Sequence, residues 1–438
     1  MAAGVAKVRG EERAVGGRDW AWGFHWLIVL VAVVGACWPA LARGATPNLV
    51  IILCDDLGYG DLGCYGGEKI KTPNLDRLAR EGVRFTDFYA GGAQCTPSRA
   101  SMLTGRYPAR FGLTFSLMTN AGAGIPASEI LLPQLLRQRG YATFLAGKWH
   151  LGDQPKFHPM KHGFEHFEGL LRGHDTDPRE YWRDDRIIDK EAELTTLTQR
   201  YVGAATRFIA EQARAKRPFF LMLAHTSPHT PLAPGAAFKG KSAGGAYGDC
   251  VEEIDDSVGR VLEALKTSGV DDNTLVFFAS DNGPFVGKDG QGGSTGRLRA
   301  GKFSTYEGGI RVPAIFWFPS GAKARVESRP AILLDIFPTF VSLAGAALPV
   351  DRAIDGKDLS PLLLEQKPGD ARTLYFYFQD ELQACRSGDW KLKVGKEATE
   401  LFDLSMDPAE AHDLSQANLG VVARLQSEMK AFERSISN

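Results

Sequence analysis

Two pairs of oxygen-bearing side chains each follow an apolar stretch of the chain. Asp55 and Asp56 end one stretch, and Asp281 and Asn282 end another. Carboxylate and amide oxygens suit Ca²⁺ or Mg²⁺ better than a soft metal. Each pair alone is better explained by a turn or a helix cap than by a metal site, because Asp-Asn-Gly is itself a good turn sequence. Because both pairs stand at the same position relative to a predicted strand, a metal site becomes as good an explanation as turns or caps.

A cysteine precedes a helix-like segment. Cys95 opens the sequence CTPSR, residues 100–104 are helix-like, and Pro97 is predicted at the first helical position. A group at Cys95 would then face backbone N–H donors and the positive end of the helix dipole, where anions bind. From these residues alone, Cys95 is either an activated thiolate or an ordinary loop cysteine, and the ordinary case is commoner.

The longer segment around Cys95 resembles the signature of the formylglycine-dependent sulfatases. Residues 95–106 read CTPSRASMLTGR. In that family, the cysteine of Cys-x-Pro-x-Arg is oxidised to an aldehyde by a maturation enzyme. Further segments match family motifs in the family's order: 55–61 (DDLGYGD), 147–152 (GKWHLG), 280–283 (SDNG), and 301–302 (GK) with 306–309 (YEGG). The resemblance extends from Pro47 to about Leu414.

The resemblance assigns a role to ten residues. The expected ligands of one metal ion, Ca²⁺ rather than Mg²⁺, are Asp55, Asp56, Asp281, Asn282 and the modified Cys95. Arg99 and Lys148 are expected to stabilise the hydrated aldehyde. Lys148, Lys302 and His229 are expected to contact the sulfate, and His150 to act on the second hydroxyl of the hydrate.

The chemistry of sulfate esters agrees with these roles. A sulfate monoester is anionic and a poor electrophile, so cations must neutralise charge at sulfur before attack. A geminal diol offers one hydroxyl that attacks sulfur and a second that later expels sulfate, which divides the reaction into two easier steps. Asp281 is suited to be the first base, His229 or Lys302 to protonate the departing alcohol, and His150 to take the last proton.

Each of these residues also has an ordinary explanation. His150 alone could be a core histidine, His229 could belong to a proline-rich loop, and Lys148 and Lys302 would usually be solvated. A phosphate or phosphonate monoester hydrolase of the same superfamily is the rival enzyme class, since fold and motif do not fix the transferred group. A non-catalytic carbohydrate-binding relative is disfavoured, because the chain keeps the nucleophile, the ligands and the lysine–histidine set.

Three scaffold segments resemble the N-acetylgalactosamine-6-sulfatase branch, with the arylsulfatase A type as its neighbour. They are residues 157–164, 247–257 and 351–356. The resemblance implies a sulfated carbohydrate substrate, such as 6-sulfated galactose or N-acetylgalactosamine, or else an aryl sulfate. The chain departs from that branch at 115–127 and 170–193, and substrate-facing loops vary readily on a fixed scaffold. The natural ester is therefore left open.

The elements that must position these residues alternate between strand and helix. We expect strands at 48–53, 141–146, 219–223, 274–279 and 312–317, and helices at 72–81, 131–139, 198–215 and 247–267. This alternation predicts an α/β fold with a large, mostly parallel central sheet flanked by helices. The resemblance to the sulfatases implies that this fold is alkaline-phosphatase-like. Parallel sheets gather their sites at the carboxyl ends of strands, where both acidic pairs stand.

The chain divides into three predicted parts. Residues 1–42 are expected to be a signal peptide, 46–348 the catalytic domain, and 349–438 a small α+β subdomain. In the last part, 373–378, 384–394 and 400–404 are predicted antiparallel strands, and 419–434 a helix. Basic residues before an apolar run that ends in Ala40-Leu41-Ala42 predict export, to the periplasm or outside the cell, by a cleaved signal; an uncleaved membrane anchor is the alternative.

Composition limits the partners. The chain has 51 basic and 52 acidic residues, and it lacks a Lys/Arg block, so no nucleic-acid partner is expected. Five cysteines follow the predicted cleavage site, so at least one is outside an intramolecular disulfide. They form no CxxC pair, which disfavours a zinc knuckle. The sequence is compatible with a homo-oligomer and leaves the oligomeric state open.

Overall fold

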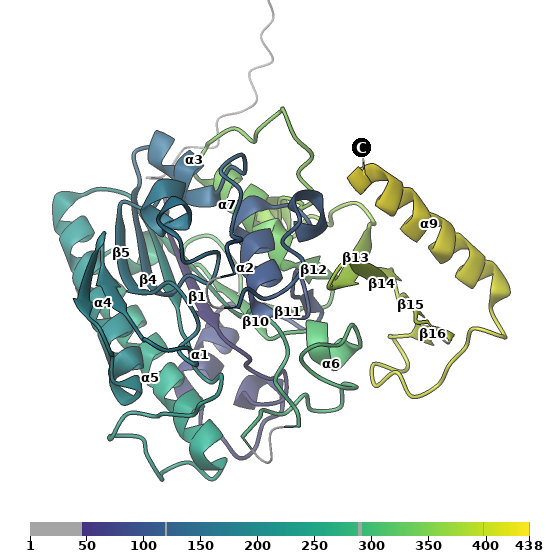
Figure 1. The fold of residues 1–438 in the computed structure, drawn as a ribbon, viewed down its shortest axis with the longest axis horizontal. Coiled ribbons are helices and arrows are strands. Elements are labelled where there is room, and N and C mark those ends of the chain that lie inside the picture. The colour runs from purple at the N-terminus through teal and green to yellow at the C-terminus, as the bar shows by residue number, and fades with distance from the viewer. Residues whose placement is uncertain (1–45, 119–120, 288–290, 397, 438) are drawn as a thin grey trace, which may run out of the picture. The chain divides into compact units, whose positions relative to one another are not determined.

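A ten-stranded sheet forms the centre of the protein (Figure 1). The computed structural model describes residues 46–437 except 119–120, 288–290 and 397, so the predicted signal peptide lies outside the described residues. The strand order is β11-β2-β10-β9-β1-β8-β4-β5-β6-β7. The strands are β1 (Asn48–Cys54), β2 (Val83–Phe85), β4 (Ala142–Lys148), β5 (His166–Leu170), β6 (Tyr181–Arg183), β7 (Arg186–Asp189), β8 (Phe219–Ala224), β9 (Thr274–Ser280), β10 (Ala314–Trp317) and β11 (Arg325–Glu327).

The five central strands β9, β1, β8, β4 and β5 pair in parallel. Every residue of β1, β4, β8 and β9 is buried, as expected for strands covered on both faces. The predicted mostly parallel α/β fold is confirmed. The predicted strand at 312–317 is also present as β10, but it runs antiparallel to β9.

Helices cover both faces of this sheet. Alternate residues of β1 belong to different cores, with Leu49 and Ile51 on one face and Val50 and Ile52 on the other. The first face packs against α2 (Cys95–Thr104), α3 (Leu132–Gln138) and α7 (Ile336–Leu343). The second face packs against α1 (Pro73–Glu81), α4 (Leu197–Ala215) and α5 (Gly245–Thr267), and Figure 1 shows α4 and α5 beside the teal strands. Two short helices, α6 (Glu307–Ile310) and α8 (Ser360–Glu365), complete this part.

Two smaller sheets accompany the large one. β3 (Phe88–Tyr89) pairs with β12 (Ala331–Ile332). β13 (Thr373–Phe378), β14 (Glu381–Ser387), β15 (Trp390–Val394) and β16 (Thr399–Asp403) form an antiparallel sheet in chain order. The helix α9 (Leu419–Ser437) packs on this sheet through Leu425 and Met429, and Figure 1 shows both in yellow-green.

Two local predictions were wrong. The segment 384–394 is a hairpin of β14 and β15 rather than one strand, because Gly388 turns the chain with a φ of 63°. Helix α2 begins at Cys95, so Pro97 is its third residue rather than its first. A proline is tolerated there because first-turn N–H groups have no partner within the helix. In the described part of the chain, no helix is long and apolar enough to cross a membrane.

Candidate active site

The two acidic pairs meet at the carboxyl ends of neighbouring strands. Cys54 of β1 pairs with Ser280 of β9, so the next residues, Asp55 and Asp281, begin side by side. The Asp281 N–H donates to the Cys54 carbonyl at 3.0 Å. Asp56 has a φ of 66°, and its N–H donates to the Asp281 carboxylate at 3.3 Å. The parallel register therefore brings together residues 225 positions apart in the chain.

Cys95 adds its sulfur to this cluster. One ligand atom from each of Asp55, Asp56, Cys95 and Asp281 lies within 4.8 Å of the others, and all four residues are buried. The Cys95 Sγ lies 3.1 Å from the Asp55 carboxylate. Asn282 donates its amide N–H to Asp56 at 2.7 Å, while its buried Oδ1 has no hydrogen-bond partner. Three carboxylates and an unpartnered amide oxygen form the donor set that Ca²⁺ prefers.

Helix α2 places Cys95 and Arg99 one turn apart on the same face. Arg99 is fully buried, and its guanidinium donates to the Asp281 carboxylate through Nε at 3.0 Å and contacts it through Nη2 at 2.8 Å. Its Nη1 donates to the Lys148 carbonyl at 3.1 Å, at the end of β4. This single side chain thus connects α2 with the ends of β4 and β9.

Two lysines complete the charge balance. The Lys148 Nζ lies 2.5 Å from Asp55, and the Lys302 Nζ lies 2.8 Å from Asp56. Together with Arg99 they supply three cations against three carboxylates. A divalent cation bound among these carboxylates would leave the site with excess positive charge. The site is therefore suited to an anion such as a sulfate ester.

The buried charges shift the pKa values of the acids in different directions. Burial alone would raise the pKa of Asp55, but the charges of Lys148, His229 and Arg99 outweigh it and hold the pKa well below its usual range. Burial and the charge of Asp55 raise the pKa of Asp281 to about 6. Burial, with the charges of Asp281 and Asp55, raises the pKa of the Cys95 thiol well above its usual value. The activated thiolate considered from the sequence is thus disfavoured.

His150 is held with one ring nitrogen free. Its backbone has a φ of 56°, and its carbonyl accepts the Thr96 hydroxyl at 3.0 Å. The Nε2 lies 3.1 Å from the Leu117 carbonyl, which can only accept, so we assign the proton to Nε2. Nδ1 is buried without a partner, and burial together with the charge of Lys148 keeps the pKa of His150 well below its usual value. A neutral imidazole with a free Nδ1 is equipped to accept a proton.

His229 lies against a second histidine that the sequence did not single out. The His229 Nε2 is 3.7 Å from Asp56, and its Nδ1 is 2.5 Å from the Thr230 carbonyl. The ring of His174 meets the ring of His229 edge to face, with centroids 5.6 Å apart. His174 is buried, and its Nε2 lies 3.2 Å from the Pro231 carbonyl. His174 therefore supports both the ring of His229 and the loop that carries it.

All ten residues selected from the sequence lie in or beside this cluster. Nine of them contact another member directly, and His150 contacts Thr96 and Leu117. The residues that sequence reasoning missed, Thr96 and His174, touch members of the set rather than forming a motif of their own. No spacing signal in the sequence points to either.

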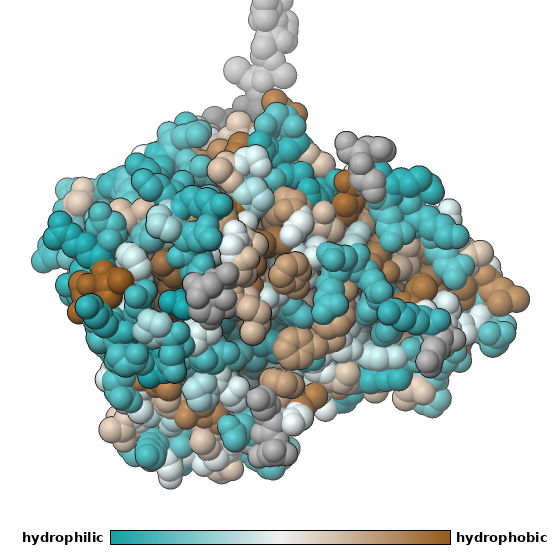
Figure 2. Space-filling model, in the orientation of Figure 1, coloured by the Kyte–Doolittle hydropathy of each residue, from teal (hydrophilic) through white to brown (hydrophobic). Residues whose placement is uncertain are grey.

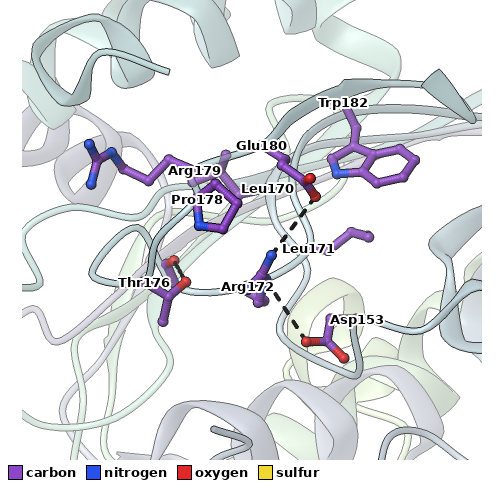
Figure 3. A pocket seen from close by; sticks show the side chains of 10 residues that line it. Asp153, Leu170, Leu171, Arg172, Thr176, Pro178, Arg179, Glu180 and Trp182 are labelled. Carbon is purple, nitrogen blue, oxygen red and sulfur yellow. Dashed lines mark hydrogen bonds and ion pairs between the residues drawn. The ribbon is translucent and has the colours of Figure 1, made fainter. Parts of the chain in front are cut away.

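A small pocket adjoins the site (Figure 3). It includes Gly173, where an added Cβ would lie 3.8 Å from the Lys148 Nζ. Arg172 points between the carboxylates of Asp153 and Glu180, at 3.9 and 3.8 Å. The pocket has room for about 20 Å³, which suits a water molecule rather than a sugar.

Comparison with known proteins identifies the family. The sulfatase family matches residues 47–346, and the C-terminal region of the N-sulphoglucosamine sulphohydrolase family matches residues 301–435. The chain belongs to the sulfatase family.

Its relatives include named sulfatases. Human N-acetylgalactosamine-6-sulfatase is 44% identical over 79% of this chain and 71% of its own length, and human arylsulfatase A is 40% identical over 84% and 79%. The crystal structure of Ps i-CgsB in complex with k-i-k-neocarrahexaose is 34% identical, with a TM-score of 0.81 over 88% of this chain and 92% of that one. The protein is accordingly a sulfatase, an enzyme that hydrolyses sulfate esters.

Proposed function

We propose that this sulfatase releases sulfate from sulfated carbohydrates, using a formylglycine at position 95 and one Ca²⁺ ion. One observation carries the proposal: Cys95 lies in a buried cluster of three carboxylates that three cations balance. The names of the relatives support a carbohydrate ester, namely N-acetylgalactosamine-6-sulfatase and a structure that holds a neocarrahexaose.

The proposed groups would supply two kinds of chemistry. When present, the hydrated aldehyde offers two hydroxyls on one carbon, and Ca²⁺ held by Asp55, Asp56, Asp281 and Asn282 offers Lewis-acid stabilisation of charge. The remaining steps belong to the chain's own side chains.

The cations bind and orient the sulfate. Lys148 and Lys302 stand on two sides of the carboxylate cluster, paired with Asp55 and Asp56, so both ammonium groups can contact an anion bound between them. Arg99 is held by Asp281 and lies behind Cys95. An anion held by these lysines would lie close to position 95, because Asp55 contacts both Lys148 and the Cys95 sulfur.

The reaction requires three proton transfers, and four side chains are candidates for them. Asp281, whose pKa is about 6, is suited to accept a proton from the attacking hydroxyl. His229 or Lys302 can donate a proton to the departing alcohol oxygen. His150 is neutral, and its free Nδ1 can accept the proton of the hydroxyl that finally expels sulfate.

The Cys95→Ala variant tests the nucleophile. We expect no sulfate release from sulfated galactosides or from 4-nitrophenyl sulfate, with an unchanged Tm, because the substitution removes only a small buried side chain. Mass spectrometry of the peptide that contains Cys95 should show the aldehyde in the wild type. Turnover in the variant, or an unmodified cysteine in fully active enzyme, contradicts the proposal. Rates measured in parallel on phosphate and phosphonate monoesters show whether the enzyme prefers sulfate esters to these esters.

A thermal shift tests the metal without using activity. Ca²⁺ added to chelator-treated enzyme should raise Tm, since a ligand at 100 times its Kd stabilises by about 2.7 kcal/mol. The Asn282→Ala variant should show a smaller rise because it lacks the unpartnered Oδ1. Equal shifts in both proteins would exclude Asn282 as a ligand.

We also propose export with removal of residues 1–42, supported by the basic and apolar pattern before Ala42. N-terminal sequencing of the mature protein should begin at Arg43.

A further inference from the structure

An aromatic ring stands beside the proposed sulfate-binding lysine. The centroid of the Phe303 ring lies 5.3 Å from the Lys302 Nζ, which itself lies 2.8 Å from Asp56. Phe303 is 42% exposed, although most aromatic rings of this protein are buried. The ring of Phe285 supports it edge to face, with centroids 5.3 Å apart and an interplanar angle of 90°. The ring of Phe303 thus contacts both Phe285 and Lys302 and still remains partly exposed to solvent.

The backbone of Phe303 is strained. Its φ is 70°, in the left-handed region that a bulky side chain rarely adopts. Two backbone hydrogen bonds hold this geometry: Phe303 N–H donates to Ala93 at 3.0 Å, and Lys302 N–H donates to Pro284 at 2.9 Å. An exposed ring gains little from burial, so neither its strain nor its position helps folding. Strain retained in this way indicates a function.

Other exposed apolar side chains belong to segments that adjoin the site. We call Phe115, Met118, Val286 and Phe303 the apolar rim; each is at least 40% exposed. The loop of Phe115 and Met118 is tied to the site, because its Leu117 carbonyl contacts His150 and its Ser116 N–H donates to Gln94. In Figure 2, hydrophobic surface lies near the centre of this face, in the region where Figure 1 shows α6, and hydrophilic surface surrounds it.

The site therefore combines a cluster of charged side chains with the apolar rim on neighbouring segments. A substrate that fits it carries an anionic group at one end and an apolar face next to that group. A sulfated pyranose has this character, because the C–H groups on one side of its ring form an apolar face that stacks on aromatic rings.

We propose that Phe303 is a substrate-binding platform on which the pyranose that carries the sulfate ester stacks. The inference rests on the proposed function and adds to it the residue that recognises the sugar. The ring centroid lies 5.3 Å from the ammonium that would hold the sulfate, so a sugar joined to that sulfate through its ester oxygen would be within reach of the ring.

The Phe303→Gly variant tests this platform, because glycine adopts the same backbone without strain. We expect the KM for a sulfated galactoside to rise about tenfold, in keeping with the loss of one stacking contact, while kcat changes by less than about twofold. The inhibition constant of inorganic sulfate, which has no ring, should stay the same. Tm should stay the same or rise, and Phe303→Trp should keep the KM low.

A control separates strain from recognition. Gln366, after α8, also has a positive φ, of 56°, and lies outside the site, so Gln366→Gly should leave the KM unchanged. An unchanged KM in Phe303→Gly overturns the inference. So does a parallel weakening of inorganic sulfate, which would mean that Lys302 had moved. If the wild type releases sulfate from no sulfated sugar, the proposed function fails and this inference ends with it.

Discussion

Left-handed backbone conformations gather around the reacting atoms. Asp56, His150, Ala300 and Phe303 all have φ values between 56° and 70°, although none is glycine. Such residues each cost about 1–3 kcal/mol and persist only where the surroundings determine them. Asp56 and His150 each stand two residues after the end of a buried strand, where the left-handed backbone turns the chain at the site. The backbone conformation therefore helps to fix the geometry of the site, in addition to the contacts between side chains.

His174 should matter through His229 rather than through the substrate. The structure makes it a positioning residue, with its ring on His229 and its Nε2 on the Pro231 carbonyl. His174→Phe keeps the ring and loses the hydrogen bond, so His229 should be less well placed to protonate the departing alcohol. We expect kcat for a sugar sulfate to fall about tenfold, but kcat for 4-nitrophenyl sulfate to fall by less than about twofold, because nitrophenolate leaves without a proton.

His229→Ala provides the reference for this comparison, since it removes the proposed acid itself. It should show the same dependence on the leaving group, with a larger loss. Equal losses on both substrates in His174→Phe would instead indicate a purely structural role. Burial and the charge of His229 lower the pKa of His174 to about 4, so no change in its charge is expected near neutral pH.

The sequence predicted the residues that carry charge or nucleophilicity better than those that support them. Cys95, Lys148 and Lys302 lie within recognisable motifs. His174 lies in an irregular loop, and its partner His229 is 55 positions away, so neither period nor spacing marks the pair. Phe303 directly follows Lys302 in the chain, yet its exposure and its φ are properties of the folded backbone alone.

At the scale of elements, long buried segments were predicted and short polar ones were missed. β1, β4, β8 and β9 are apolar throughout, so their composition alone indicated strands. β6 and β7 have only three and four residues, with mostly exposed side chains, and pair as an antiparallel extension of the sheet. The sequences of such edge strands show no apolar alternation. These segments are strands because they pair with a neighbouring strand, which the sequence alone does not reveal.

Helix α2 contacts two loops and also carries Cys95, the proposed nucleophile. The buried Thr96 hydroxyl donates to the His150 carbonyl at 3.0 Å and accepts from the Leu117 N–H at 3.1 Å. Thr96→Val keeps the shape but leaves both groups without this partner, so His150 and the loop at 115–118 should lose their fixed positions. We expect kcat per modified enzyme to fall about tenfold and stability to fall by about 2 kcal/mol.

Thr104 offers a matched control in the same helix. It is equally buried, but its hydroxyl donates to Ala100 within α2. Thr104→Val should lower the free energy of unfolding by a similar amount and leave kcat unchanged. Formylglycine content must be measured in each variant by mass spectrometry. Equal kcat values in the two variants would show that α2 does not position the loops.

At the scale of the whole described chain, a buried charge network joins the C-terminal sheet to the loop of Lys302. Lys391 on β15 is fully buried and contacts Glu307 at 2.9 Å and Glu410 at 2.8 Å. Glu307 begins α6, five residues after Lys302, and its N–H donates to the Glu410 carboxylate at 2.6 Å. The C-terminal sheet thereby helps to fix the segment that carries a proposed sulfate ligand.

Removal of Lys391 should both destabilise the protein and reverse a pH dependence. Burial alone would raise the pKa of Glu307, but the charges of Lys391 and Arg311 hold it at about 2, below the ordinary 4.5. This group therefore contributes stability above about pH 4.5, and the contribution is lost as the pH falls toward 2. Lys391→Met leaves two carboxylates buried together, which should cost about 3–5 kcal/mol at pH 8.

The sign of the pH effect distinguishes this charge network from simple packing. Without Lys391, burial and mutual repulsion should raise a carboxyl pKa of the Glu307–Glu410 pair above the unfolded value. The folded variant then binds a proton that the unfolded chain releases, so its stability is highest below about pH 4.5 and declines as the pH rises. Urea unfolding should show a smaller difference from the wild type at pH 5 than at pH 8. An equal difference at both pH values would mean that Lys391 acts through its packing, and that the C-terminal sheet holds the Lys302 loop without this charge network.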